Sequence, residues 1–148
     1  MTSAFRHIVT LCTGNICRSP MAEILLAHAL SASGVRVSSA GIGALVDAPA
    51  DPLAIALMQE RGLDLSAHRG RQATSELLYT ADLVLTAEDV HTRWVLDHNP
   101  ALRGRVFRLT KFSGDHDIPD PYRQARPAFE AALKEIDAGI TGWLPRLK

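Results

Sequence analysis

A cysteine and an arginine separated by five residues have the types and spacing needed for phosphoryl transfer. Cys12 and Arg18 bracket a short loop in the segment C-T-G-N-I-C-R-S-P. A thiolate is a strong nucleophile and needs no separate base. A guanidinium offers a planar fork of donors to two phosphate oxygens and keeps that grip as their charge redistributes. The spacing therefore predicts that Cys12 attacks a phosphorus atom whose oxygens Arg18 binds.

The residues on both sides of this loop predict a strand before it and a helix after it. Residues 8–11 form a short run of apolar and β-branched residues, Ser19 is a candidate N-cap, and Pro20 suits a first helical position. In such a turn, backbone N–H groups point into one concavity, and the helix adds the positive end of its dipole. This environment favours the thiolate form of Cys12. The predicted phosphate-binding residues are Thr13, Gly14, Asn15, Ile16, Cys17, Arg18 and Ser19.

A buried structural cysteine and a zinc site are the alternatives for this segment. A lone cysteine at the end of a strand is usually a small apolar core residue. Here the cysteine, glycine, arginine, serine and proline occur together at a strand-to-helix junction, which favours the reactive site. The chain has two cysteines, not spaced as C-x2-C, and lacks a matching histidine pair for zinc. We therefore predict no metal and no cofactor.

The loop sequence resembles the phosphate-binding loop of the low-molecular-weight protein tyrosine phosphatases. A second motif of that family, D-P-Y, begins at Asp120. Three further segments resemble the bacterial branch associated with exopolysaccharide and capsule export: S-S-A-G-I-G-A-L from Ser38, A-D-P-L-A-I from Ala50, and I-P-D-P-Y-R from Ile118. The resemblance spans nearly the whole chain. It implies metal-independent hydrolysis of phosphotyrosine through a phosphocysteine intermediate.

Asp120 is the candidate general acid of this reaction. Tyrosine leaves as a phenolate whose conjugate acid has a pKa of about 10, so a positioned acid accelerates its loss roughly 10²- to 10⁴-fold. Pro121 restricts Asp120 to an extended conformation that can aim the carboxyl group out of its loop. A simple turn is the alternative for an Asp-Pro pair, but the family's acid sits in this motif. A neighbouring thiolate and phosphate dianion favour the protonated carboxyl, and the carboxylate left afterwards can activate water.

The resemblance also implies residues that support the loop. Asn15, Ser39 and His68 match family positions whose hydrogen bonds hold the loop in its strained shape. Ser19 has two possible roles, because one hydroxyl cannot readily serve both. It either donates a hydrogen bond to the Cys12 sulfur or caps the following helix.

The resemblance leaves Cys17 with two roles and suggests walls for the substrate ring. Cys17 either forms a reversible disulfide with the nucleophile, as in the family, or is buried behind the loop. The predicted walls are residues 42–46, with Leu45 among them, and Tyr122.

Alternating strand and helix patterns predict one doubly wound α/β domain over residues 1–148, a length sufficient for a single core. The patterns predict a three-layer sandwich of about four strands and about five helices, and the resemblance implies a four-stranded parallel sheet in the order 2-1-3-4. Strands are expected at 8–11, 35–39, 82–86 and 105–109. The expected helix caps are Ser19, Asp51, Ser66, Thr74 or Ser75, and Thr86, and the last helix carries residues 129–143, weakened by Gly139 and Gly142.

Charge and apolar patterning restrict the partners of the chain. Sixteen basic residues balance sixteen acidic ones, so no overall field attracts nucleic acid or an anionic membrane. The first apolar run is too short for a signal peptide or a membrane span, and two cysteines suit a reducing compartment. We expect a cytoplasmic monomer that releases inorganic phosphate. The resemblance suggests an autophosphorylated tyrosine kinase of polysaccharide export as its phosphotyrosine substrate.

Three competing functions are less well supported. An arsenate reductase of the same fold would need further cysteines, and none follows Cys17. A non-catalytic phosphotyrosine-binding module would need neither a nucleophile nor an acid. Nucleic-acid binding would use a basic cluster that lacks aromatic residues for stacking bases. That cluster consists of Arg103, Arg105, Arg108 and Lys111.

Overall fold

Four parallel strands form the central sheet of the protein in the computed structural model, which describes residues 4–148. The strands are β1 (His7–Cys12), β2 (Arg36–Gly41), β3 (Leu83–Thr86) and β4 (Val106–Arg108). Their spatial order is β2-β1-β3-β4, which confirms the predicted parallel sheet and its order. The carboxyl ends of β1 and β3 are neighbours in this sheet, so the segments that follow them converge at one edge.

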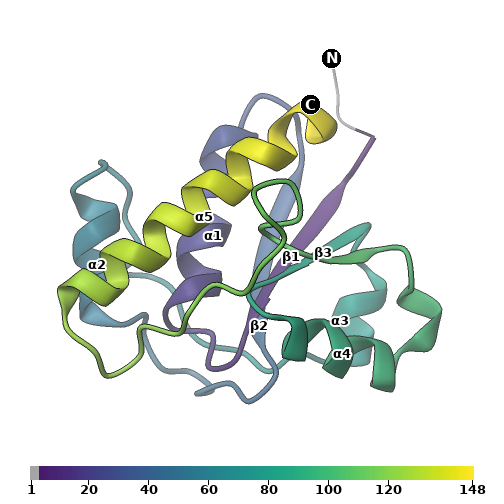
Figure 1. Ribbon diagram of the computed structural model, residues 1–148, viewed down its shortest axis with the longest axis horizontal. Helices are drawn as coiled ribbons and strands as arrows, with labels where there is room; N and C mark the ends of the chain where they lie inside the picture. The colour runs from purple at the N-terminus through teal and green to yellow at the C-terminus, as the bar shows by residue number, and fades with distance from the viewer. Residues whose placement is uncertain (1–3) are drawn as a thin grey trace.

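Helices cover both faces of the sheet (Figure 1). One layer contains α1 and α5, with α2 beside them, and the other contains α3 and α4. Between residues 4 and 148, no helix is both long enough and apolar enough to cross a membrane. The helices are α1 (Arg18–Ala29), α2 (Pro52–Gln59), α3 (Ser75–Tyr79), α4 (Asp89–His98) and α5 (Arg126–Leu147), and a short 3-10 turn covers Pro100–Leu102.

Side chains of β1 alternate between the two helical layers, as the twofold period of a strand requires. Ile8 joins the core formed with α1 and α5, whereas Val9 and Leu11 join the core formed with α3 and α4. All three are at most 1% exposed, and full burial of one such side chain stabilises the fold by about 1.5–3 kcal/mol. This packing on both faces fixes the end of β1, where Cys12 lies.

Two of the predicted helix caps are confirmed. The Asp51 side chain accepts a hydrogen bond from the Leu53 N–H at 2.9 Å, at the start of α2. The Thr74 hydroxyl accepts one from the Leu77 N–H at 3.1 Å, at the start of α3. Each side chain satisfies a backbone donor that the helix leaves unpaired.

The other predicted caps are wrong. Cys17 is the N-cap of α1, so Ser19 lies inside the first turn of that helix. Glu88 is the N-cap of α4, because Thr86 still belongs to β3 and its hydroxyl pairs with that of Thr92 at 2.7 Å. Ser66 caps no helix; its N–H and hydroxyl both donate to the Asp64 carboxylate.

Gly139 and Gly142 do not interrupt α5, which runs unbroken over 22 residues. A Cβ atom on Gly139 would lie 2.8 Å from the carbonyl oxygen of Leu109 and 2.9 Å from its Cγ. A Cβ atom on Gly142 would lie 3.0 Å from the Cβ of Phe112. The glycines therefore let α5 approach the segment that follows β4.

We expect Gly139→Ala to lower the free energy of unfolding, although alanine is favoured in helix interiors by about 1 kcal/mol. The new methyl group would push α5 away from the backbone of Leu109, and overpacking of this kind costs about 1–3 kcal/mol. Urea denaturation measures the change. Thr141→Ala, at an exposed position of the same helix, is the control and should be neutral or slightly stabilising. A higher urea midpoint for Gly139→Ala would contradict the packing explanation.

Candidate active site

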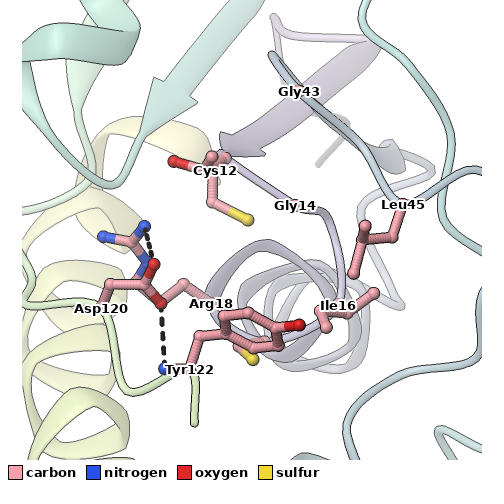
Figure 2. Close-up of a pocket in the computed structure, with 10 residues that line it drawn as sticks. Cys12, Gly14, Ile16, Arg18, Gly43, Leu45, Asp120 and Tyr122 are labelled. Carbon is pink, nitrogen blue, oxygen red and sulfur yellow. Dashed lines mark hydrogen bonds and ion pairs between the residues drawn. The ribbon is translucent and has the colours of Figure 1, made fainter.

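A cavity of about 140 Å³ opens at the carboxyl end of β1, and most of the predicted site residues line it. Figure 2 shows the Cys12 sulfur turned into the space between Asp120 and Tyr122 on one side and Ile16 and Leu45 on the other. The cavity brings together residues from three separate parts of the sequence. Its lining residues are Cys12, Thr13, Gly14, Ile16, Cys17, Arg18, Gly43, Leu45, Asp120 and Tyr122.

Ser19 lies behind the cavity and contacts the sulfur of Cys12. Its hydroxyl oxygen is 2.9 Å from the Cys12 Sγ and accepts a hydrogen bond from the Asn15 side-chain amide at 2.8 Å. Asn15 occupies one acceptor position on this oxygen, so the hydroxyl hydrogen can go to the Cys12 sulfur at 2.9 Å or to the more distant carbonyl oxygen of Ala40 at 3.4 Å. Of the two roles considered for Ser19, this geometry supports a hydrogen bond that stabilises a thiolate.

Asn15 is the centre of the loop's internal support. It is fully buried, and its φ of 59° places it in the left-handed region, which asparagine tolerates better than most residues. Its side-chain nitrogen also donates to the Ser39 hydroxyl at 2.9 Å, and its side-chain oxygen accepts from the Arg71 N–H at 2.9 Å. The His68 Nε2 donates to its carbonyl oxygen at 2.7 Å. The structure thus places Ser39 and His68 on Asn15, with Arg71 as a third support that the sequence did not reveal.

Arg18 crosses the floor of the site with only 2% of its side chain exposed. Its Nη1 donates to the Glu88 carboxylate and to the carbonyl oxygen of Ile118, both at 2.6 Å. Its Nη2 lies 3.5 Å from the Asp120 carboxylate. Its Nε has no hydrogen-bond partner among residues 4–148. Burial of an unpaired guanidinium donor is costly, so this edge of Arg18 is suited to an anion in the cavity.

Glu88 and His91 are functional candidates that the sequence analysis missed. Glu88 holds Arg18, and the His91 ring contacts Thr13 at 2.8 Å. Both follow β3, the neighbour of β1, and polar residues after such a strand were the signal that could have revealed them.

Asp120 faces the cavity from the loop before α5. Its Oδ1 accepts a hydrogen bond from the Tyr122 N–H at 3.1 Å, and its Oδ2 is the oxygen directed at Arg18. The dashed lines in Figure 2 mark both contacts. The side chain is 45% exposed, so it can exchange protons with solvent. One oxygen is thereby held by the backbone, and the other lies beside the Arg18 guanidinium at the cavity.

Apolar side chains form the upper part of the cavity. Leu45 is 44% exposed and Tyr122 39% exposed, whereas Ile16 is buried at 8%. Their apolar surfaces surround a space above the sulfur that suits a flat aromatic ring.

Cys17 also lines the cavity as a buried free thiol. Burial, and then the negative charge of Asp51, raise the pKa of Cys17 far above its ordinary value. Cys17 therefore stays protonated at neutral pH and is a poor nucleophile beside Cys12. Among residues 4–148, no cluster of three or more His, Cys, Asp or Glu side chains could hold a metal ion.

The buried His91 makes stability depend on pH. Burial, and then the positive charge of Arg18, lower the pKa of His91 to about 4. An unfolded histidine has a pKa of about 6.5, so between these values the unfolded chain binds a proton that the folded chain excludes. The free energy of unfolding should therefore decrease as the pH is lowered. His91 should contribute a loss of about 2 kcal/mol between about pH 7.5 and about pH 5.

Urea denaturation at the two pH values measures this loss. In His91→Asn, the decrease in the free energy of unfolding between the two pH values should be smaller by about 2 kcal/mol, the contribution of His91. An undiminished pH dependence in the variant would assign the loss to other groups.

Comparisons with known proteins agree with this geometry. Residues 7–148 match the family described as "Low molecular weight phosphotyrosine protein phosphatase". The chain is 46% identical over 143 residues to the probable low molecular weight protein-tyrosine-phosphatase EpsP of Ralstonia nicotianae, with 97% of each chain covered. It is 38% identical over 143 residues to Wzb of Escherichia coli K12, with 97% of this chain and 96% of Wzb covered.

A solved structure is similar over the whole fold. Vibrio vulnificus Wzb in complex with benzylphosphonate superposes with a TM-score of 0.92 at 37% identity, covering 97% of this chain and 100% of that one. The chain therefore belongs to the low-molecular-weight protein tyrosine phosphatase family and is a phosphatase of the Wzb and EpsP type.

Proposed function

We propose that this phosphatase cleaves phosphotyrosine through a phosphocysteine at Cys12, with Arg18 holding the phosphoryl oxygens and Asp120 moving the protons. The observation that carries the assignment is the buried Arg18, whose Nε is unpartnered among residues 4–148 and whose Nη2 faces the cavity that Cys12 lines. These two donors match two oxygens of a phosphate.

Two in-line displacements account for the reaction. The Cys12 sulfur attacks phosphorus, the bond from phosphorus to the phenolic oxygen breaks, and Asp120 protonates that oxygen as it takes the electron pair. A water molecule then attacks phosphorus and gives its proton to the Asp120 carboxylate. The P–S bond breaks, its electron pair returns to sulfur, and inorganic phosphate leaves. The Ser19 hydroxyl stabilises the returning thiolate.

The cavity's shape supports an aromatic substrate. The walls of Ile16, Leu45 and Tyr122 are apolar and stand above the sulfur, so a phosphotyrosine ring can reach Cys12 while its phosphate meets the loop. A phosphoserine side chain is shorter and lacks a ring to bury against these walls. The Vibrio vulnificus relative was solved in complex with benzylphosphonate, which carries an aromatic ring, and this supports an aromatic substrate for the present chain.

The natural substrate we propose is an autophosphorylated tyrosine kinase of polysaccharide export. Its support is the similarity to EpsP and Wzb, which belong to the exopolysaccharide-associated branch. We further propose a monomer that acts in the cytoplasm, where its two free cysteines would remain reduced.

Peptide hydrolysis tests the proposed function directly. The protein should release phosphate from phosphotyrosine peptides and not from matched phosphoserine peptides, and Cys12→Ser should be inactive on both. Activity on phosphoserine alone would contradict the proposal. Binding of phosphotyrosine peptides without hydrolysis would indicate the binding module instead, and thiol-dependent turnover of arsenate would indicate the reductase.

Asp120→Ala should slow phosphotyrosine hydrolysis by about 10²- to 10⁴-fold, because the phenolate would leave without a proton. The loss should be smaller for 4-nitrophenyl phosphate, whose leaving group is a weaker base. The measurement is kcat for both substrates, with Asp97→Ala, an exposed carboxylate on α4, as the control. Equal losses on the two substrates would argue against proton donation by Asp120.

A further inference from the structure

His91 lies outside the cavity, yet its ring joins two parts of the active site. The side chain is fully buried. Its Nδ1 lies 3.0 Å from the backbone N–H of Glu88, and its Nε2 lies 2.8 Å from the Thr13 hydroxyl oxygen. A backbone N–H can only donate, so Nδ1 is the acceptor and carries no proton. The neutral ring therefore carries its proton on Nε2 and donates it to Thr13.

The residue at one end of this link, Thr13, directly follows the nucleophile and lines the cavity. Its carbonyl oxygen accepts a hydrogen bond from the Gly43 N–H at 3.0 Å. The His91 ring, which belongs to α4, binds the side-chain hydroxyl of Thr13. Thr13 is thus held both through its backbone and through its hydroxyl, which restricts the direction of the loop's N–H groups.

The residue at the other end, Glu88, holds the phosphate-binding arginine. Its carboxylate accepts from Arg18 at 2.6 Å, while its backbone N–H donates to His91. One imidazole therefore connects the residue that follows the nucleophile to the residue that orients Arg18. Thr13 and His91, which form one of these contacts, are 78 positions apart in the sequence.

We infer that His91 is a positioning residue, which fixes the loop's N–H groups relative to the Arg18 guanidinium for the transition state. This inference rests on the proposed function. In the transition state the phosphoryl group must be held by both sets of donors at once, so an error in their relative placement costs rate more than it costs substrate binding. A buried histidine that merely satisfied the start of α4 would affect stability alone.

The experiment combines variants at both ends of the link. His91→Asn keeps a side-chain oxygen able to accept from the Glu88 N–H but is too short to reach Thr13. Thr13→Val removes the hydroxyl at constant shape. Each should lower kcat about tenfold with little change in KM, and the double variant should be no slower than the slower single variant. Thr13→Ser, which restores the hydroxyl, should recover most of the loss seen in Thr13→Val.

A second measurement does not depend on turnover. Orthovanadate adopts the five-coordinate geometry of the transition state, whereas inorganic phosphate is tetrahedral. In His91→Asn, vanadate affinity should fall by about the same factor as kcat/KM, with phosphate affinity nearly unchanged. His7→Asn is the matched control, because His7 is buried at 4% at the far end of β1 and pairs with Ser38. It should alter the urea midpoint and leave kcat and vanadate affinity unchanged.

The outcomes separate the two claims. A wild-type protein with no phosphotyrosine turnover would overturn the proposed function. An active wild-type protein whose His91→Asn variant loses stability but keeps its kcat and vanadate affinity would overturn the positioning role. Independent, multiplicative effects of His91→Asn and Thr13→Val would overturn it as well. If His91→Asn does not fold, an unchanged kcat in Thr13→Val overturns the inference, and a tenfold loss rescued by Thr13→Ser supports it.

Discussion

Cys12→Ser is expected to fold normally, bind phosphate and lose at least about 10⁴-fold in turnover. Serine occupies nearly the same volume, so the buried end of β1 and the contact with Ser19 can persist. A hydroxyl, however, loses its proton far less readily than a thiol, and the side-chain partner at this position, Ser19, is not a general base. Stopped assays with a phosphotyrosine peptide measure the loss, and calorimetry measures the retained phosphate binding.

The matched control for this variant is Cys17→Ser, which alters the other buried thiol of the cavity. Its high pKa keeps Cys17 from acting as the nucleophile, so the variant should retain far more turnover than Cys12→Ser. A phosphoenzyme should be trapped by rapid quenching in the wild-type protein and absent in Cys12→Ser. Substantial hydrolysis by Cys12→Ser would exclude Cys12 as the attacking group.

Arg18→Lys is expected to lower kcat by about 10³-fold or more while the protein still folds. Lysine keeps a positive charge beside the Glu88 carboxylate, so no uncompensated buried charge is created. In the wild-type protein, Nη1 of Arg18 binds both Glu88 and the carbonyl oxygen of Ile118. A single ammonium group cannot make these two contacts and also donate two hydrogen bonds to phosphate. The variant should therefore lose transition-state stabilisation and bind phosphate at least about tenfold more weakly.

The control is a surface arginine that uses its planar fork to form two parallel hydrogen bonds to a carboxylate. Arg61 donates from Nη1 and Nη2 to the two oxygens of Asp137, and both side chains are about 40% exposed. Arg61→Lys should leave kcat unchanged. Near wild-type turnover in Arg18→Lys would mean that charge alone suffices and that the planar fork is not used.

The groups that we propose to react could be selected from the sequence because their residue types are concentrated in short segments. Cys12, Gly14 and Arg18 lie within seven residues, and a strand and a helix on either side fix the shape between them. Asp120 was identified by its local Asp-Pro-Tyr context and by resemblance. The order of the strands likewise followed from the family resemblance, and the observed sheet confirms it.

Local rules compete with contacts from elsewhere at two positions. Ser19 has the right type for an N-cap, but Asn15 and the Cys12 sulfur engage its hydroxyl inside the helix. Gly139 has the lowest helix propensity after proline, yet the backbone of Leu109 requires a residue without a side chain there. In both cases a tertiary contact outweighed a preference of about 1 kcal/mol.

By itself, the sequence predicted Cys12 as the nucleophile and Arg18 as the phosphate-binding residue, because a contiguous segment carries both, and it determined the fold class through its alternating strand and helix patterns. The tertiary structure alone decided which groups hold that loop in place. Glu88 meets Arg18 across 70 positions and His91 meets Thr13 across 78, and neither pair has a local signature. They meet because β3 lies beside β1, so that the segments leaving both strands share one edge of the sheet.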